Sequence, residues 1–192
     1  MTEVGYWRQV KTWPTGANDK CGDCFLAMVA NLHVLVTTVM GHPYVMSDEE
    51  VERAYTVWKG FDPNNPATDV GMSVEETLKD WCKTGWPGMA WLKPPAYFRV
   101  SDSIPNWIEQ YGGVCAWCYL PVDENDDPIM GDRALAKYAS TDPHAVLIVG
   151  HEPGYYQLAT WGAVYRVSEA WWAKFGRETF VVVHPQWRKP TP

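Results

Sequence analysis

The chain has 192 residues, of which 46% are hydrophobic, 14% aromatic and 20% charged, and its formal net charge is -7. This composition excludes a disordered chain, and the length suits one domain, residues 1–192, with its own core. The acidic balance excludes nucleic acid as a partner, and no stretch is apolar enough for a transmembrane span or a secretory signal. Peptides or small molecules are the expected partners.

The first forty residues combine an irregular segment with one strongly apolar segment. Residues 1–20 mix aromatic, proline and glycine residues with polar ones without a period, which predicts an extended lead-in. Residues 25–40 are apolar nearly all round, which predicts a buried helix. Asp23 stands where an N-cap belongs, and Gly41 follows the apolar run, so the helix should lie between them.

Two further helices are predicted from capping signatures. Ser47 is followed three residues later by Glu50, which predicts a helix through about residue 59. Ser73 and Glu76 repeat this pattern and predict a second helix that ends near residue 84. The Asp-Pro-Asn-Asn-Pro sequence between them is typical of turns.

After about residue 95 the pattern changes from helical to β. Apolar and β-branched runs predict strands, with one short helix early in this half and one late. The expected strands are 114–122, 145–150, 155–161 and 180–183, and the expected helices are 104–111 and about 170–175. A mainly helical half, residues 1–98, would thus precede a mainly β half, residues 99–192, which is an α+β arrangement.

The sequence around Cys24 is suited to nucleophilic chemistry. Cys24 stands at the start of the predicted buried helix, in the sequence Cys-Gly-Asp-Cys-Phe. The positive end of the helix dipole and the free backbone N–H groups there stabilise a thiolate and can hold an oxyanion. Cys24 is therefore the candidate nucleophile.

A histidine at the start of a predicted strand is the candidate base. His144 opens the sequence His-Ala-Val-Leu-Ile-Val-Gly, and the following strand ends in Thr160-Trp161-Gly162. A cysteine on a helix end and a histidine on a facing strand are what thiol acyl transfer requires. His33 lies nine residues after Cys24, on the opposite side of the helix, and is not the expected partner.

These motifs resemble the papain-like cysteine peptidases. That family has a glutamine, then C-G-x-C-W, then H-A-V-x-x-V-G and finally N-S-W-G, and the corresponding segments occur here in the same order across residues 18–162. The short Gly-Asp-Cys form with a late histidine is similar to small papain-fold proteins encoded by tailed phages of actinobacteria. The resemblance implies a helical half packed against a β-rich half, with a cleft between them.

The resemblance also implies roles for individual residues. Cys24 matches the nucleophile, His144 the general base, and Asn18 the position of the oxyanion-hole glutamine. We expect the Cys24 sulfur to lie within hydrogen-bond reach of a His144 ring nitrogen. The asparagine that orients the histidine in the family falls on Ala159, whose methyl group cannot hydrogen-bond to an imidazole.

Thr160 is the neighbouring candidate for this orienting role, with Trp161 packing over the histidine. If Pro153-Gly154 forms a two-residue hairpin loop, Ala159 and Trp161 share a face with His144, and Thr160 points away. Only a β-bulge would reverse this parity. The sequence therefore predicts a Cys24–His144 dyad without a third residue.

Two other uses of the cysteines compete with this interpretation. Five cysteines, an odd number, predict mainly free thiols. Cys21 and Cys24 form the C-x-x-C of thiol redox proteins, but no strand precedes them as that motif requires. Four of the cysteines could be written as a zinc site, but Cys115 and Cys118 lie three apart in a strand and point to opposite faces. We expect no metal and no cofactor.

The leading functional hypothesis is a cysteine hydrolase that cleaves peptide or amide bonds. The alternatives are a catalytically silent papain-fold module that binds other phage virion proteins, and a phage cell-wall amidase or endopeptidase. The expected partner of an enzyme is a peptide or protein substrate. The phage resemblance implies a location in the host cytoplasm or the virion.

Overall fold

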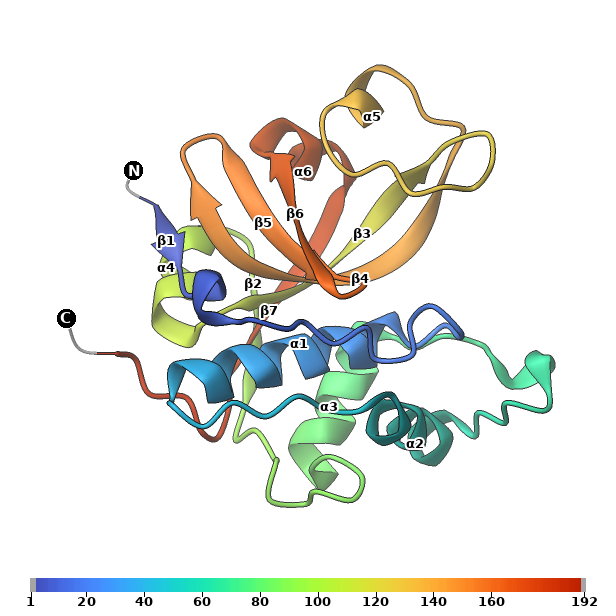
Figure 1. Cartoon of the computed structure of the whole chain (residues 1–192), viewed down its shortest axis with the longest axis vertical. Coiled ribbons are helices and arrows are strands. Elements are labelled where there is room, and N and C mark those ends of the chain that lie inside the picture. The colour runs from blue at the N-terminus through green and yellow to red at the C-terminus, as the bar shows by residue number, and fades with distance from the viewer. Residues whose placement is uncertain (1–2, 191–192) are drawn as a thin grey trace.

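The computed structural model describes residues 3–190 as a helical layer and an antiparallel sheet that meet along one long helix (Figure 1). The predicted α+β arrangement is confirmed, with most helices in the N-terminal half and most strands in the C-terminal half. No helix within residues 3–190 has the length and apolar character needed to cross a membrane.

The helical layer is built around α1 (Cys24–Val39), which is buried over nearly its whole length. Its apolar side chains cover every face, so the helix must be enclosed by other elements, and in Figure 1 it lies between the sheet and the helices α2 and α3. Those elements are α2 (Asp48–Lys59), α3 (Val74–Thr84) and the short helices η1 (Trp7–Gln9) and η2 (Pro66–Thr68).

The two predicted capping boxes have different outcomes. At α2 the Ser47 side chain accepts from the Glu50 backbone N–H, and the Glu50 carboxylate accepts from the Ser47 N–H, so this box is confirmed. At α3 the Ser73 side chain makes no capping hydrogen bond, so the second box is wrong although the helix is present.

The sheet has seven antiparallel strands, six of them in the order β2-β7-β3-β4-β5-β6, with β1 paired to β4. The predicted strands are present, although β4 begins earlier and β7 begins earlier than expected. The strands are β1 (Val4–Gly5), β2 (Tyr97–Val100), β3 (Val114–Val122), β4 (Ser140–Glu152), β5 (Tyr155–Thr160), β6 (Ala163–Ser168) and β7 (Gly176–Val182).

Three short helices accompany the sheet: α4 (Ile104–Tyr111), α5 (Arg133–Ala136) and α6 (Glu169–Phe175). Strands β1, β2 and β6 were not predicted. Each is short or carries mixed polar residues, so the alternation that marks a half-buried strand is weak in them.

The central strands bury both of their faces. In β4, Leu147 and Val149 join the hydrophobic cluster that contains α1, whereas Val146 and Ile148 join a second cluster that contains α4 and α6. This alternation follows from the two-residue period of a strand. The sheet is therefore a buried platform, and its strands fix the positions of the side chains that face the helical layer.

Candidate active site

A cavity of about 740 Å³ lies between the helical layer and the sheet, and both predicted catalytic residues line it. Cys24 reaches it from the first residue of α1, and His144 reaches it from β4. Their shared cavity agrees with the sequence prediction. The remaining walls come from residues that the sequence did not single out for the cleft, chiefly Met72, Val74, Trp117, Tyr119 and Glu178.

Cys24 begins α1, as predicted, and its side chain is only partly exposed. Burial raises the pKa of the thiol, and the negative charge of Asp23 raises it further. The backbone N–H groups of Ala145, Phe25 and Cys24 itself act in the opposite direction. The contact with Ala145 places the sulfur beside the backbone that directly follows His144.

The His144 side chain is held in place by Thr160 and Trp161, from the end of the next strand. Its Nε2 atom lies 2.8 Å from the Thr160 hydroxyl oxygen, and its ring stacks on Trp161 with centroids 4.3 Å apart. The side chain is buried, and this burial lowers the pKa of the imidazole to about 4. His144 is therefore a neutral base at pH 7.

The partner of His144 is Thr160, so the expectation that Thr160 points away from the histidine is wrong. The hairpin closes with Glu152 opposite Tyr155, as expected, but the register shifts between Ile148 and Gly150. This bulge adds one residue to β4 and reverses the parity between the far ends of the two strands. Gly150, directly after the extra residue Val149, was the available signal, because a glycine inside a strand often marks a bulge, but the strand was expected to end at residue 150.

The bulge turns Ala159 away from the imidazole. Ala159 pairs with Leu147, is 0% exposed and belongs to the hydrophobic cluster that contains α1. It therefore cannot stand in for the family's asparagine. The Thr160 hydroxyl lies beside His144 Nε2 instead.

Trp161 adopts a backbone conformation that is unusual for a bulky residue. It has a φ of 46° and Gly162 has a φ of 72°, between the paired residues Thr160 and Ala163. Two positive φ values are what a type I′ hairpin turn requires, and glycine or asparagine normally occupies such positions. This strained turn places the Trp161 indole against the His144 ring.

Replacing Ala159 by asparagine is expected to destabilise the protein by about 3 kcal/mol, because it crowds a packed core and buries an amide without a partner. Urea unfolding monitored by tryptophan fluorescence measures this loss. Ala136→Asn, at an exposed position, is the matched control and should change the stability little. An unchanged stability for Ala159→Asn would instead place position 159 beside the imidazole.

Replacing Thr160 by valine should leave His144 Nε2 buried without a hydrogen bond, at a cost of about 2 kcal/mol. Nitrogen NMR of the imidazole should then show a mixture of the two neutral tautomers where the wild type shows one. Thr160→Ser keeps the hydroxyl and should retain the single tautomer. A single tautomer in the valine variant would mean that Trp161 alone holds the ring.

Cys24 and His144 do not form a thiolate–imidazolium pair in this structure. The hydrogen bonds of residues 3–190 include none between the Cys24 sulfur and either His144 ring nitrogen, and the expected close approach of these atoms stays a prediction. The pKa of the thiol is raised and that of the imidazole is lowered, and both shifts favour the neutral forms. Any reaction would therefore begin from a thiol and a neutral imidazole.

Asn18, the predicted oxyanion donor, lies in the turn that precedes α1 and is half-buried. Its amide nitrogen Nδ2 is buried and has no hydrogen-bond partner. Asn18 is not among the residues that line the cavity. It carries a buried donor that no group of the described residues uses.

Hydrogen bonds hold the loop before Cys24 against the segment that carries Asp69. The Gly22 backbone N–H donates to both carboxylate oxygens of Asp69, at 2.9 and 3.1 Å, and the Tyr55 hydroxyl donates to the same carboxylate at 2.8 Å. A Cβ atom on Gly22 would lie 2.9 Å from Asp69 Oδ1, so only glycine permits this approach. These bonds fix the loop from which Cys24 projects.

The other cysteines lie outside this chemistry. All five are free thiols. Cys115 and Cys118 are buried in the sheet, and Cys118 donates to the backbone carbonyl of His144 at 3.7 Å. Within residues 3–190 no group of three or more histidine, cysteine or acidic side chains is arranged to hold a metal ion.

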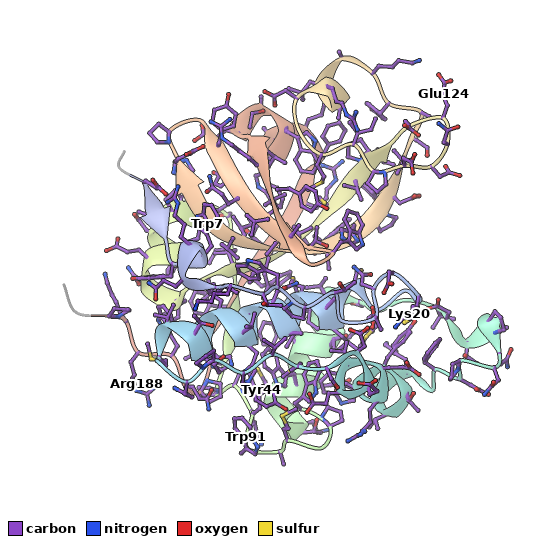
Figure 2. All side chains as sticks on the ribbon, in the orientation of Figure 1. Trp7, Lys20, Tyr44, Trp91, Glu124 and Arg188 are labelled. Atoms are coloured by element: carbon purple, nitrogen blue, oxygen red, sulfur yellow. The ribbon has the colours of Figure 1, made fainter. Side chains whose placement is uncertain are left out.

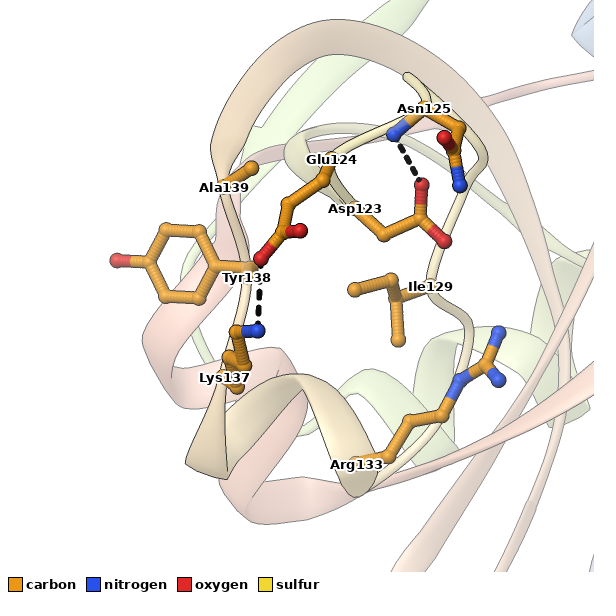
Figure 3. A pocket seen from close by; sticks show the side chains of 8 residues that line it. All are labelled: Asp123, Glu124, Asn125, Ile129, Arg133, Lys137, Tyr138 and Ala139. Atoms are coloured by element: carbon orange, nitrogen blue, oxygen red, sulfur yellow. Dashed lines mark hydrogen bonds and ion pairs between the residues drawn. The ribbon is translucent and has the colours of Figure 1, made fainter.

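A second cavity, of about 330 Å³, lies at the far end of the sheet around α5 (Figure 3). Its charged groups are largely engaged with one another. Lys137 pairs with Glu124 at 2.7 Å, and Asp123 accepts from the backbone N–H groups of Asn125 and Asp127 in a tight turn. Figure 2 shows Glu124 well away from the junction of the two layers, which Lys20 marks.

Two solved structures resemble this chain over nearly its whole length. A cysteine protease of Carica candamarcensis, in complex with E-64, shares 13% sequence identity and a TM-score of 0.61, over 96% of this chain and 99% of that one. Xylellain, a cysteine protease of Xylella fastidiosa, shares 12% identity and a TM-score of 0.52, over 96% of this chain and 86% of that one. The fold is that of the papain-like cysteine proteases.

Among the comparisons with known proteins, the similarity to papain-like proteases comes from the solved structures. No protein-family model matches the sequence, and no curated protein matches it by sequence similarity. At identities of 12 and 13% the likeness concerns the path of the chain. What the site does must be argued from its own residues.

Proposed function

We propose that the protein is a papain-like cysteine hydrolase that cleaves peptide or amide bonds, with Cys24 as nucleophile and His144 as base. The observation that carries this proposal is that Cys24, on the first turn of a buried helix, and His144, held by Thr160, line one cavity. The volume of the cavity, about 740 Å³, is that of a ligand site, and the cavity lies between the helical layer and the sheet.

In the proposed reaction, an Nε2–H group of His144 donates to the Thr160 hydroxyl, which leaves Nδ1 free to accept the thiol proton of Cys24. The sulfur attacks the substrate carbonyl, and the Cys24 backbone N–H and the Asn18 amide hold the oxyanion. His144 returns the proton to the leaving amine. Water then hydrolyses the acyl-enzyme and regenerates the thiol.

A binding module of the same fold is the second candidate, and one observation favours it. The buried thiol and imidazole are both in their neutral forms and share no hydrogen bond. A module of this kind would keep the cavity as a peptide-binding groove. Phage virion proteins as its partners, and a phage origin, remain predictions of the sequence resemblance, as does the cell-wall amidase or endopeptidase alternative.

The deciding experiment is incubation of the protein with a mixture of unrelated denatured proteins, followed by mass spectrometry of the new peptide termini. A hydrolase should produce termini that are absent with Cys24→Ala. Asn18→Ala should lower the rate by about 100-fold or more if its amide holds the oxyanion. E-64, the compound bound to the plant protease, serves as an independent probe of the thiol.

Failure of both readouts would favour the binding module. Wild-type protein and Cys24→Ala would then release no new termini, and E-64 would not modify Cys24. Retention of peptides from the same mixture by both proteins would support a groove without catalysis.

A further inference from the structure

Three carboxylates surround the loop that leads into Cys24, and two of them are fully engaged. Asp48 accepts from the Ala17 backbone N–H and from Lys20 Nζ, each at 3.2 Å. Asp69 accepts from the Gly22 backbone N–H. These two carboxylates anchor the loop by ordinary charge-assisted hydrogen bonds.

The third carboxylate, Asp23, has no such role. It is 0% exposed, and neither of its oxygens has a hydrogen-bond partner. It was predicted to cap α1 with its side chain, but its backbone carbonyl alone accepts from the Leu26 and Ala27 N–H groups, at 2.7 and 3.1 Å. The thiol of Cys21 donates to the Ala17 carbonyl at 3.7 Å.

We propose that Asp23 is a positioning residue that sets the protonation state of Cys24. With a neutral carboxyl at position 23, only burial opposes a Cys24 thiolate at the helix start; with an ionised one, the neighbouring negative charge opposes it as well. The inference deepens the proposed function, since it concerns the reactivity of the same sulfur. Relative to an uncharged residue 23, the ionised carboxyl makes the site less reactive on the alkaline side of neutrality.

The groups that face Asp23 support this inference. Burial raises the pKa of the Asp23 carboxyl to about 7, against the opposing effects of the Cys21 thiol and the Asp23 backbone N–H, and the charges of Asp48 on α2 and Asp69 after η2 add to the rise. Cys21, in the same loop, is held as a thiol because burial raises its pKa to about 12. Lys20, the cation of this loop, is paired with Asp48. An isolated buried carboxyl next to acids must release its proton late.

The test is the rate of Cys24 alkylation by iodoacetamide from pH 5.5 to pH 9, resolved by peptide mass spectrometry. No substrate is needed, so the result does not depend on whether the protein hydrolyses anything. The ratio of the Asp23→Asn rate to the wild-type rate should be near one at pH 5.5. It should rise through pH 7 to about tenfold at pH 8.5, because a like charge shifts a thiol by one pKa unit or more.

Two further variants distinguish an effect of the Asp23 charge from an effect on the structure of the loop. Asp23→Ser provides a second uncharged residue that suits a helix start, and it should show the same pH-dependent ratio. Asp19→Asn removes an exposed charge from the same loop and should leave the ratio at one. A ratio that is equal at all pH values would indicate a loosened loop and overturn the proposal. So would a Cys24 that labels in none of these proteins.

Discussion

Asp23→Asn is expected to raise the free energy of unfolding at pH 8 by about 4 kcal/mol. The carboxyl has a pKa of about 7 in the folded protein and 3.8 as its ordinary value. Between these two pH values the unfolded chain gives up a proton that the folded protein retains, so the wild type loses stability as the pH rises. Above pH 7 the full loss is present, and asparagine avoids it.

Urea unfolding at pH 4, 6 and 8 measures this effect. Wild-type protein and the asparagine variant should differ little in stability at pH 4, because the unfolded chain has only begun to release the Asp23 proton there. Asp69→Asn serves as the contrasting control, because Asp69 is hydrogen-bonded to Gly22 and Tyr55. Its removal should destabilise the protein at pH 8, since these bonds are lost. A variant at position 23 that is equally stable at pH 4 and pH 8 relative to wild type would contradict the prediction.

Acidification from pH 7 to pH 5 is expected to cost about 2 kcal/mol of stability for each of His33 and His144. Burial lowers the pKa of both side chains to about 4, from an ordinary value of 6.5. Below pH 6.5 these histidines therefore bind protons in the unfolded chain, whereas in the folded protein they bind them only near pH 4. Stability is complete above pH 6.5 and is lost progressively between these two values.

His33 is coupled to a second buried histidine at the C-terminal end of the sheet. His184 Nδ1 accepts from the Gln186 backbone N–H, so the proton of its neutral ring lies on Nε2, which faces His33 Nδ1 at 3.0 Å. Burial and the neighbouring His33 lower the pKa of His184 well below its ordinary value. Protonation of either ring would bring two N–H donors to face each other. Protonation of both histidines is therefore disfavoured in the folded protein.

The variant His33→Gln tests this part of the acid sensitivity. Its amide oxygen can still accept from His184, but it takes up no proton. The difference in unfolding free energy between pH 7 and pH 5 should shrink by about 2 kcal/mol relative to wild type. His42→Gln, at an exposed position, should leave that difference unchanged. An equal pH dependence in all three proteins would show that His33 does not control it.

Much of this fold can be predicted from local sequence patterns. The segment that becomes α1 is apolar nearly all round, which favours a buried helix, and the apolar runs of β3, β4 and β5 favour strands in a covered sheet. Cys24 and His144 are placed by these elements, one at the start of α1 and one in β4. This is why their presence in one cavity was predictable without a structure.

The partner of His144 was not predictable, because it depends on strand register. A single extra residue at Val149 decides whether Thr160 or Ala159 faces the imidazole, and the one local signal, Gly150, also suits the end of a strand. The walls of the cavity were missed for a related reason. Trp117 and Tyr119 read as ordinary strand residues, and only the packing of the two layers leaves them beside Cys24.

The sequence by itself determined the α+β class, the order of the main elements and the two reactive side chains, because these follow from apolar periodicity and from residue chemistry. Tertiary structure decided the electrostatic state of the site. Burial neutralises the thiol, the imidazole and the Asp23 carboxyl, and burial is a property of contacts between segments far apart in the chain. A helix cap was the natural expectation for Asp23, but the packing around the loop left its carboxyl enclosed and without a partner.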